Sequence, residues 1–439
     1  PPTEQRLPPP SAEPGIKRPT PNYDGRVEES TSAGEALIWV PRVLLFPLHL
    51  VLEYVIRWPM VQGITLAEEQ NLLTRVERFF TFSDGDGGLF PTLFFDFGLS
   101  PSMGLYFFHD DVLVKDHNIT MQLGYWPRSW LHVIVKDEFR VFKDSSGTVA
   151  SRAEVIYRPD YVYNGLGPNS RQQDERRFRL QQTEVEMSLR AAFTGLHRLS
   201  VGLFYRNTKI LDGQDPGIAE TGSPLDVTDP LQVPGYGGTY NLLQAKMALE
   251  LDSRSPDRIS RPGSGVRLDL FGSLAMDPGD PELRFLRYGG EAAGFWDVTG
   301  LNHVLALRFY AELLERVGDT HVPFTERIAL GGGEHLRGFL EGRLRGDSAM
   351  VVTLDYRYPI WSFLDANLFV SVGNAFLGRF DALHLKRMMM NWGLALRTNT
   401  SRNVSLDIIV ALGTNRFEQW DDNFRVDNVR ATFGINQGF

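Results

Sequence analysis

The residue types best placed for a strong polar contact occur in one loop and in the strand that follows it. Three successive glycines, residues 331–333, exclude a regular helix or strand and predict a loop with sharp turns. Arg337, Gly338 and Phe339 come next, so this loop carries a permanent cation beside an aromatic ring. A guanidinium inside a protein requires a nearby anion, because it does not lose its proton. We therefore predict a charge-assisted hydrogen bond, single or bidentate, between Arg337 and Asp355.

The strand that carries Asp355 has two chemically different faces. Residues 348–358 alternate between apolar and polar side chains, with Val352, Leu354, Tyr356 and Tyr358 on one face and Thr353, Asp355 and Arg357 on the other. An apolar face toward lipid and a charged face toward water are typical of a membrane barrel. If the glycine-rich loop folds into the barrel, Asp355 and Arg357 are expected to contact it.

No group of residues has the spacing of a catalytic or metal site. The chain has no cysteine, which excludes disulfides, thiolate metal sites and thiol nucleophiles. An outer-membrane lipase or acyltransferase would need a Ser or His nucleophile system, but the histidines lack a neighbouring Ser and acid in a recognisable spacing: His117, His132, His197, His303, His321, His335 and His384. We predict no enzymatic activity, no catalytic residue, no cofactor and no metal. The formal net charge of −9 also argues against a nucleic-acid partner.

From about residue 89 the sequence alternates with the period of two that is typical of β-strands. Aromatic residues at 12% and 42 glycines favour strands and turns over helices. A mean hydropathy of −0.20 is compatible with a membrane barrel, because apolar and polar residues alternate there. We predict an all-β membrane protein, a 16-stranded antiparallel outer-membrane β-barrel, with strands at 89–98, 102–111, 118–127, 130–142, 148–158, 178–192, 197–208, 238–253, 264–275, 284–297, 303–313, 347–358, 364–373, 387–397, 403–412 and 428–439.

The connections between these strands fall into two groups by length. Links that follow odd-numbered strands include long ones rich in Gly, Pro, Asp and Asn, at 159–177, 209–237, 314–346 and 413–427. Links that follow even-numbered strands are mostly short, as at 143–147, 193–195 and 399–403. Long loops on one side and short turns on the other are typical of a bacterial outer-membrane barrel with a periplasmic N-terminus. A soluble all-β array would have no reason for this sorting, and we disfavour it.

Three regions are expected along the chain. Residues 1–33 are rich in proline and polar residues and predict a disordered tail. Residues 34–88 predict a periplasmic amphipathic helical segment, and residues 89–439 the transmembrane barrel. The chain opens on Pro-Pro rather than on a charged, Met-led run, as expected for a processed protein.

The most apolar part of the N-terminal region predicts a helix over about 43–58. Its polar residues share one narrow helical face: Arg42, His49, Glu53 and Arg57. We predict that this helix lies in the membrane interface or docks under the barrel, with that face toward water or polar partner groups. A membrane-spanning helix and a partner-binding helix are the alternatives. A capping box at 65–68 predicts a second helix that ends near Phe80.

Four motifs together resemble the BamA/TamA family of outer-membrane insertase and translocase barrels, also called the bacterial surface-antigen family. They are YNGLGPN at 163–169, LRGF at 336–339, LDYRYP at 354–359 and FGINQGF at 433–439. The resemblance covers about residues 89–439. It implies a barrel in which the loop with LRGF enters the lumen, where its arginine meets an acid of the following strand. It also implies that the last motif is an assembly signal.

The sequence departs from the family pattern at three places. Ser371 stands where family members commonly carry an aspartate, which leaves Asp355 as the main acidic partner of Arg337. Gln437 replaces the usual apolar residue of the assembly signal. The first 88 residues contain no strands from which the family's periplasmic POTRA domains could be built, so the resemblance alone does not carry the insertase function to this chain.

The resemblance implies a part in insertion, assembly or translocation of outer-membrane or surface components. The expected route is the seam between the first and last strands, because Pro91 removes a ladder donor and Gly434 and Gly438 loosen the strand that ends at Phe439. The same residues could simply end the strands. The alternative function is a structural or anchoring barrel of an envelope complex, with its lumen plugged by loop 314–346. The expected partners are outer-membrane lipid, either lipopolysaccharide or phospholipid, and other envelope proteins bound through the N-terminal helices and tail.

Overall fold

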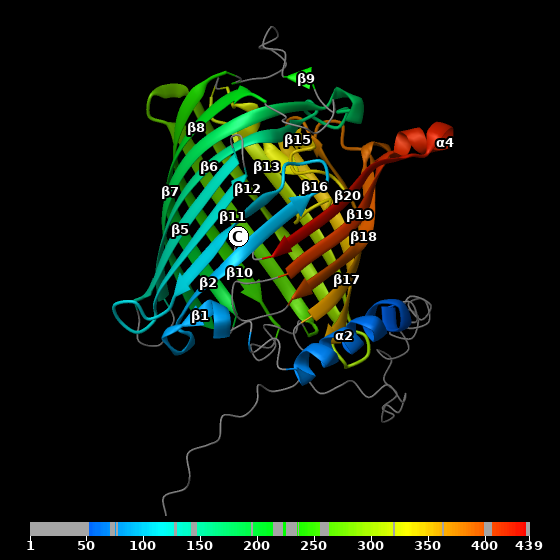
Figure 1. Ribbon diagram of the computed structural model, residues 1–439. Helices are drawn as coiled ribbons and strands as arrows, with labels where there is room; N and C mark the ends of the chain where they lie inside the picture. The colour runs from blue at the N-terminus through cyan, green and yellow to red at the C-terminus, as the bar shows by residue number, and fades with distance from the viewer. Residues whose placement is uncertain are drawn as a thin grey trace, which may run out of the picture.

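Sixteen long antiparallel strands form a closed barrel in the computed structural model (Figure 1). The sheet closes because β2 (Gly87–Asp96) pairs with β3 on one side and with β20 (Val426–Ile435) on the other. The remaining long strands follow in chain order, each antiparallel to the next: β3 (Ser102–His109), β4 (His117–Trp126), β5 (Trp130–Arg140), β6 (Gly147–Tyr163), β7 (Arg176–Thr194), β8 (His197–Asp212), β10 (Thr239–Asp252), β11 (Gly265–Asp277), β12 (Asp280–Asp297), β13 (Val304–Arg316), β16 (Ser348–Trp361), β17 (Leu364–Phe376), β18 (Met389–Thr398) and β19 (Leu406–Arg416).

All sixteen strands expected from the sequence are present, which confirms the predicted fold. The structure describes residues 52–70, 75, 78–126, 130–141, 147–194, 196–213, 223–224, 235, 237–254, 263–318, 321–361, 364–398 and 406–435. The expected tail, residues 1–33, lies outside this described part of the chain.

The two faces of the strands account for the closed sheet. On β7 the alternate residues Val185, Met187 and Leu189 are exposed on the outside, while Glu184 and Ser188 between them are buried in the barrel. A strand with this pattern can satisfy both lipid and a polar interior only in one orientation, so the alternation fixes its register.

Several strands are longer than the sequence suggested, and β6 is an example. We expected this strand, the fifth, to end at Arg158, just before Pro159, which cannot donate to a ladder. In the structure β6 continues to Tyr163 through a register shift between Arg158 and Tyr161. The bulge accommodates the proline and lets β6 and β7 continue to pair as far as Tyr163 and Arg176.

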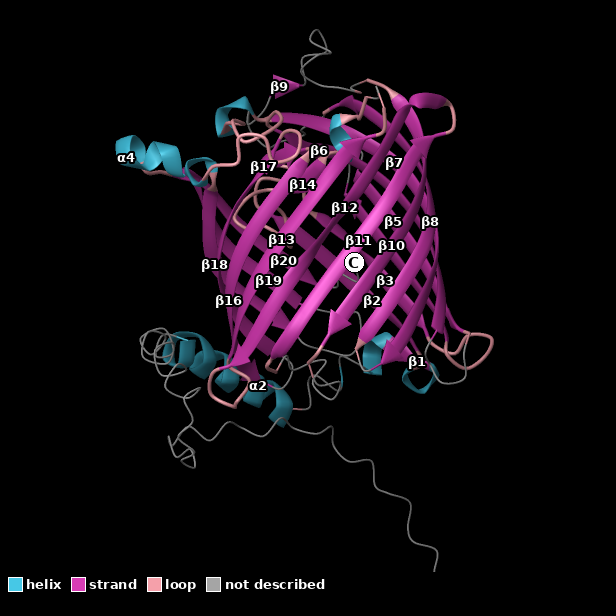
Figure 2. Ribbon diagram, turned by 180° about the vertical axis from the view of Figure 1, so that it is seen from behind, coloured by secondary structure: helices cyan, strands magenta, loops and turns pink. Residues whose placement is uncertain are grey.

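The two ends of the barrel carry different elements (Figure 2). A π-helical turn, η1 (Leu52–Arg57), runs into helix α2 (Trp58–Glu69) at one end, and the short helix α4 (Trp420–Asn423) projects from the other. Among the described residues, no helix is both long enough and apolar enough to cross a membrane. The minor elements are β1 (Thr81–Phe82), η2 (Ser83–Gly85), η3 (Gln172–Asp174), β9 (Ser223–Pro224), η5 (Phe324–Glu326), β14 (Ile328–Leu330), β15 (Leu344–Gly346), η6 (Leu385–Arg387) and η7 (Phe417–Gln419).

The expected start of the second helix was wrong, whereas its expected end near Phe80 agrees with the helical conformation of residues 75 and 78–80. The capping box at 65–68 does not start a helix, because α2 already begins at Trp58 and runs through these residues to Glu69. Pro59 lies where the π-turn meets α2; its ring and missing N–H disturb the regular hydrogen bonding of the preceding turn. The helix expected over 43–58 therefore extends further along the chain than predicted, and its residues before 52 lie outside the described part.

Candidate functional site

The connection between β13 and β16, residues 317–347, folds into the barrel, and we call it the lumen loop. It contains η5 and a small hairpin in which β14 pairs with β15. Its apolar residues join wall residues in the largest buried cluster of the described chain, which includes Phe178, Ile210, Leu242, Phe285, Phe324, Leu336 and Phe339. The loop is therefore a packed plug and not a flexible surface connection.

The glycines at 331–333 make the turn that returns the loop toward the wall. Gly331 and Gly332 have φ values of 107° and 82°, a region that other residues rarely adopt. A Cβ on Gly331 would also lie 2.0 Å from the carbonyl oxygen of Leu340. The sequence prediction of a sharply turning loop thus has a steric basis at this position.

The structure brings Arg337 of the lumen loop and Asp355 of β16 together. An Arg337 guanidinium nitrogen donates to Asp355 Oδ1 at 3.2 Å, and both side chains are buried. The other Asp355 oxygen lies 3.5 Å from Arg308 of β13. The Arg337 guanidinium also covers the Phe369 ring at 4.6 Å. Burial lowers the pKa of Arg337 to about 10, so the group keeps its proton at neutral pH.

The two residues after Arg337 fasten the loop to the C-terminal strands. The Gly338 N–H donates to Asn391 Oδ1 of β18 at 3.2 Å. A side chain at Gly338 would meet the carbonyl oxygen of Leu412 at 2.7 Å. The Phe339 ring is fully buried and lies against Gly413 of β19, where any larger residue would collide with it. This close approach explains a glycine at both positions.

The expected contact of Arg357 with the lumen loop stays a prediction, and Arg357 lines one cavity together with Gly333 and Glu334 of that loop. Among the described residues, the structure gives Arg357 neither a hydrogen bond nor an ion pair to the loop. It lies two positions beyond Asp355 on β16, about 6.7 Å further along the strand. Sharing a face with Asp355 therefore does not place it at the same depth in the barrel.

The seam between β2 and β20 has four register pairs among the described residues, and residues 436–439, which follow β20, lie outside the described part. Its described register runs only from Leu93–Ile435 to Asp96–Thr432, whereas the β6–β7 register spans almost the whole length of both strands. Pro91 lies in β2 and pairs with Leu105 of β3, on the side away from the seam. Gly434 pairs with Phe94 across the seam and with Asp407 of β19. Gly438 and Phe439 lie outside the described residues.

A buried ion pair that the sequence analysis missed joins the two strands of the seam. Arg430 of β20 donates to both carboxylate oxygens of Asp96 of β2, with distances of 2.9 and 2.6 Å for its Nε and terminal nitrogen. The Thr432 hydroxyl donates to the same carboxylate at 3.1 Å. Arg430 also donates to the carbonyl oxygens of Gly332 and Arg337 in the lumen loop. We call Arg430 and Asp96 the seam latch.

The seam latch links three separate parts of the chain. Both of its side chains are almost fully buried, so water does not replace their mutual contact. Because one guanidinium holds β2, β20 and the lumen loop, displacement of the loop would remove two of its acceptors. A signal for this pair was present in the sequence. Arg430 alternates with the apolar, lipid-facing residues of the last strand, so its side chain is expected on the inner face of the barrel.

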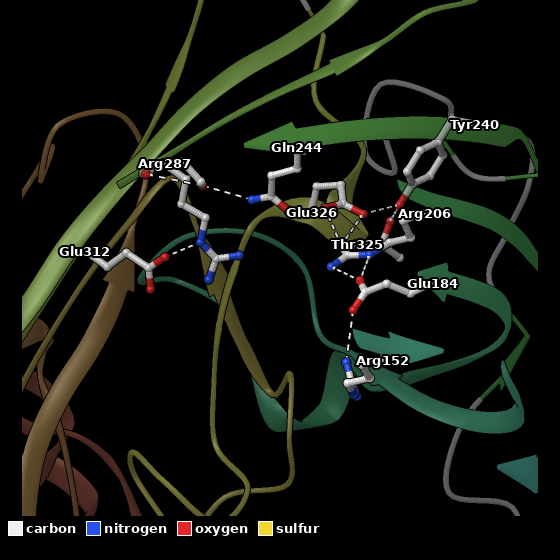
Figure 3. Close-up of polar contacts among 10 residues, drawn as sticks. Arg152, Glu184, Arg206, Tyr240, Gln244, Arg287, Glu312, Thr325 and Glu326 are labelled. Carbon is white, nitrogen blue, oxygen red and sulfur yellow. Dashed lines mark hydrogen bonds and ion pairs between the residues drawn. The ribbon is translucent and has the colours of Figure 1, made fainter. Parts of the chain in front are cut away.

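A second network fixes the lumen loop to the opposite wall (Figure 3). Glu184 of β7 accepts from Arg152 at 3.0 Å and from Arg206 at 2.6 Å. Arg206 also reaches Glu326 of the loop at 3.1 Å, and the Tyr240 hydroxyl donates to Glu326 at 2.6 Å. The loop is thus held from both sides of the barrel, by this network and by Arg337, Gly338 and the seam latch.

The N-terminal helix docks on the end of β16. Arg57 donates to Glu53 at 2.6 Å and to the carbonyl oxygen of Ile360 at 3.4 Å, and the Tyr358 hydroxyl donates to Glu53. Met60, Val61 and Ile64 pack against apolar residues of β16 and β17. Glu53 and Arg57 therefore meet polar groups of the barrel, while Arg42 and His49 lie outside the described residues.

We expect Glu53→Ala to release this helix without unfolding the barrel. The substitution leaves Arg57 without its carboxylate and Tyr358 without its acceptor, a loss of about 1–3 kcal/mol at this contact. Limited proteolysis should then cut near residues 52–69 faster than in the parent protein, at unchanged barrel melting temperature. Glu69→Ala, at the exposed end of α2, is the matched control and should leave the cleavage rate unchanged.

Comparison with known proteins places this barrel among related folds. No curated protein matches the chain. The solved structure of BamA from Haemophilus ducreyi lacking POTRA domains 1-3 covers 80% of this chain and 70% of its own, with 13% identity and a TM-score of 0.56. CdiB from Acinetobacter baumannii covers 80% of this chain at 11% identity with a TM-score of 0.50, and the match spans 60% of CdiB. At these identities the likeness establishes the fold.

The sequence itself adds the family. Residues 111–439 match the Omp85 superfamily domain, and this range contains the lumen loop, Asp355 and Arg430. The match confirms the resemblance indicated by the four motifs. By its sequence and its closed sixteen-stranded barrel, this chain belongs to the Omp85 superfamily.

Proposed function

We propose that this protein takes part in the insertion, assembly or translocation of outer-membrane or surface components, and that the β2–β20 seam is the site of this activity. The short described seam register is the observation that carries the proposal. Among the described residues, four register pairs join these two strands, against fifteen between β6 and β7, which supports a lower cost of separation. Separated strands expose unpaired N–H and C=O groups, which are a template for the strand of another chain.

The seam latch supports the same proposal. It adds a buried ion pair to the four register pairs that the described residues form across the seam. Its contacts with the lumen loop connect opening of the seam with movement of the plug. In this proposal the N-terminus lies in the periplasm and the exposed apolar faces of the strands contact outer-membrane lipid.

A reversible disulfide across the seam tests the proposal. Phe95 and Phe433 are direct partners in the β2–β20 register, and the chain has no native cysteine. Phe95→Cys with Phe433→Cys should, when oxidised, stop the reconstituted barrel from accelerating the folding of a urea-denatured outer-membrane barrel into liposomes. Reduction should restore the acceleration, because it frees the strands.

The matched control places a disulfide elsewhere in the wall. Val201 and Met247 are register partners on β8 and β10, and both side chains are exposed outside the barrel. Val201→Cys with Met247→Cys should be equally active when oxidised and when reduced. Equal activity of the oxidised and reduced seam variant would rule out the seam as the active site.

A structural or anchoring barrel is the second candidate function. The observation that favours it is the lumen loop, which is held from two sides and buries a large apolar cluster inside the barrel. In this case the N-terminal helix, docked at the end of β16, would present the barrel to other envelope proteins. Purification from the native membrane with partners in fixed ratio, together with no effect of the seam disulfide, would favour this function over the first.

A further inference from the structure

A cavity of about 260 Å³ lies inside the barrel beside the lumen loop. Its lining contains twice as many guanidinium groups as carboxylates. The arginines are Arg254, Arg267, Arg308, Arg337, Arg357 and Arg397, and the carboxylates are Glu291, Glu334 and Asp355. The lining of the cavity is therefore rich in guanidinium groups.

Most of these arginines are neutralised by carboxylates that they contact directly. Arg254 pairs with Asp252, Arg267 with Asp269, Arg308 with Glu291, Arg337 with Asp355 and Arg397 with Asp407. Arg357 differs: within the part of the chain that the structure describes, its side chain has no hydrogen bond and no ion pair. One cation of the cavity thus lacks a direct counter-charge.

A second unsatisfied group lies next to Arg357. Asn367 of β17 is its direct partner in the β16–β17 register and also lines the cavity. The Asn367 side chain is 5% exposed, and its Oδ1 is buried with no hydrogen-bond partner among the described residues. A buried amide oxygen without a partner costs about 1–3 kcal/mol. Neighbouring strands therefore present an unpaired cation and an unpaired acceptor to the same space.

We propose that this cavity binds a phosphate group, either as free phosphate or as the headgroup of a phosphorylated lipid. The oxygens of a phosphate accept charge-assisted hydrogen bonds from Arg357. The protonated oxygen of a hydrogen phosphate donates to Asn367 Oδ1, which a sulfate dianion or a chloride ion does not do. Water could solvate both groups, but it brings no negative charge to the arginine-rich lining. The volume admits a headgroup and not the acyl chains of a lipid.

The position of the cavity gives the bound anion a structural effect. Gly333 and Glu334 of the lumen loop line it, together with wall residues of β11, β12, β13, β16 and β17. A phosphate between them draws the arginines of the wall toward one centre beside the loop. Binding therefore stabilises the plugged barrel, whether or not the protein acts as an insertase.

The test uses the purified full-length chain in detergent micelles. Inorganic phosphate at constant ionic strength, balanced with chloride, should raise the unfolding temperature and give a saturable binding isotherm by calorimetry. Arg357→Gln should weaken phosphate binding about tenfold or more, as expected for loss of a charge-assisted hydrogen bond. Arg190→Gln removes the same charge from β7 outside the cavity, where Arg190 pairs with Glu138, and should bind phosphate like the parent.

Stability without phosphate separates binding from a purely structural role. Because Arg357 has no direct partner, Arg357→Gln should melt at the parent temperature or above it in chloride alone. A lower melting temperature of this variant, combined with unchanged phosphate binding, would overturn the proposal. No effect of phosphate beyond that of chloride and no effect of phosphatidic acid would overturn it as well.

A lipid arm identifies the source of the phosphate. Short-chain phosphatidic acid in mixed micelles is compared with phosphatidylcholine of the same chain length. Stabilisation by phosphatidic acid that requires Arg357, without stabilisation by inorganic phosphate, assigns the cavity to a lipid headgroup. Stabilisation by inorganic phosphate alone assigns it to a soluble anion.

Discussion

Asp96→Ala should destabilise the barrel more than any other single substitution in the seam. It leaves the buried Arg430 guanidinium without its carboxylate and removes the acceptor of the Thr432 hydroxyl. Breaking one partner of a buried pair costs about 3–5 kcal/mol. We expect this loss to lower the temperature at which the barrel opens by several degrees, measured by the gel shift of unheated and heated samples.

Two further variants separate the geometry of the latch from its charge. Arg430→Lys keeps the cation but cannot donate to both carboxylate oxygens and two loop carbonyls at once. The opening temperature of Arg430→Lys should therefore lie between those of the parent protein and Asp96→Ala. Glu138→Ala breaks the exposed Arg190–Glu138 pair and should change stability by less than about 1 kcal/mol. If Asp96→Ala behaved like Glu138→Ala, the ion pair would not close the seam.

Asp355→Ala should have the second large effect, on the lumen loop. This carboxylate faces two arginines, Arg337 at 3.2 Å and Arg308 at 3.5 Å, so its removal leaves Arg337 without an anion and Arg308 with Glu291 alone. We expect a loss of about 3–5 kcal/mol, less where water reaches the groups. Protease cleavage within residues 317–347 should become faster, and the barrel melting temperature should fall.

Arg337→Ala provides the internal comparison for this prediction. It removes the cation and its contact with the Phe369 ring but leaves Asp355 beside Arg308. Its effect on protease access and stability should therefore have the same direction as that of Asp355→Ala and be smaller. If the lumen loop stays protected from protease in both variants, the Arg337–Asp355 contact does not hold it in place.

The barrel could be predicted from the sequence because each strand carries its own evidence. An alternation such as that of Val185, Met187 and Leu189 appears within one strand and needs no knowledge of its neighbours. The end of β6 could not be predicted in the same way, because Pro159 is tolerated only through a bulge that the partner strand permits. The presence of a strand can thus be predicted from its own sequence, whereas the position of its end depends also on the neighbouring strand.

The site could be predicted only where its residues are close in the sequence. Arg337 and Asp355 belong to one loop and the strand after it, so the order of the elements brings them together. Arg430 lies in the last strand of the barrel sequence and Asp96 in the first. Their contact depends on closure of the barrel and on the register of the seam. A search for inward charges on the first and last strands would have found this pair, since a closed barrel makes those strands neighbours.

The helix and Arg357 show a different limit. The polar stripe with Glu53 and Arg57 indicates a docked helix, but not that Tyr358 and Ile360 of β16 receive it. For Arg357 the pattern gives the correct face but no polar partner, and the residue lines the arginine-rich cavity beside the lumen loop. Periodicity assigns a side chain to a face of a strand, and three-dimensional packing decides its partner.

The central claim is that the lumen loop holds the β2–β20 seam closed through Arg430. Spin labels on Phe95→Cys and Phe433→Cys, which are register partners across the seam, report its closure by dipolar broadening of the continuous-wave electron paramagnetic resonance spectrum. We predict strong broadening in this labelled protein and a loss of broadening when Asp355→Ala releases the loop. Protease cleavage will show whether the loop has been released in this variant. If the loop is released and the broadening persists, the claim is contradicted, because the seam then closes without the loop.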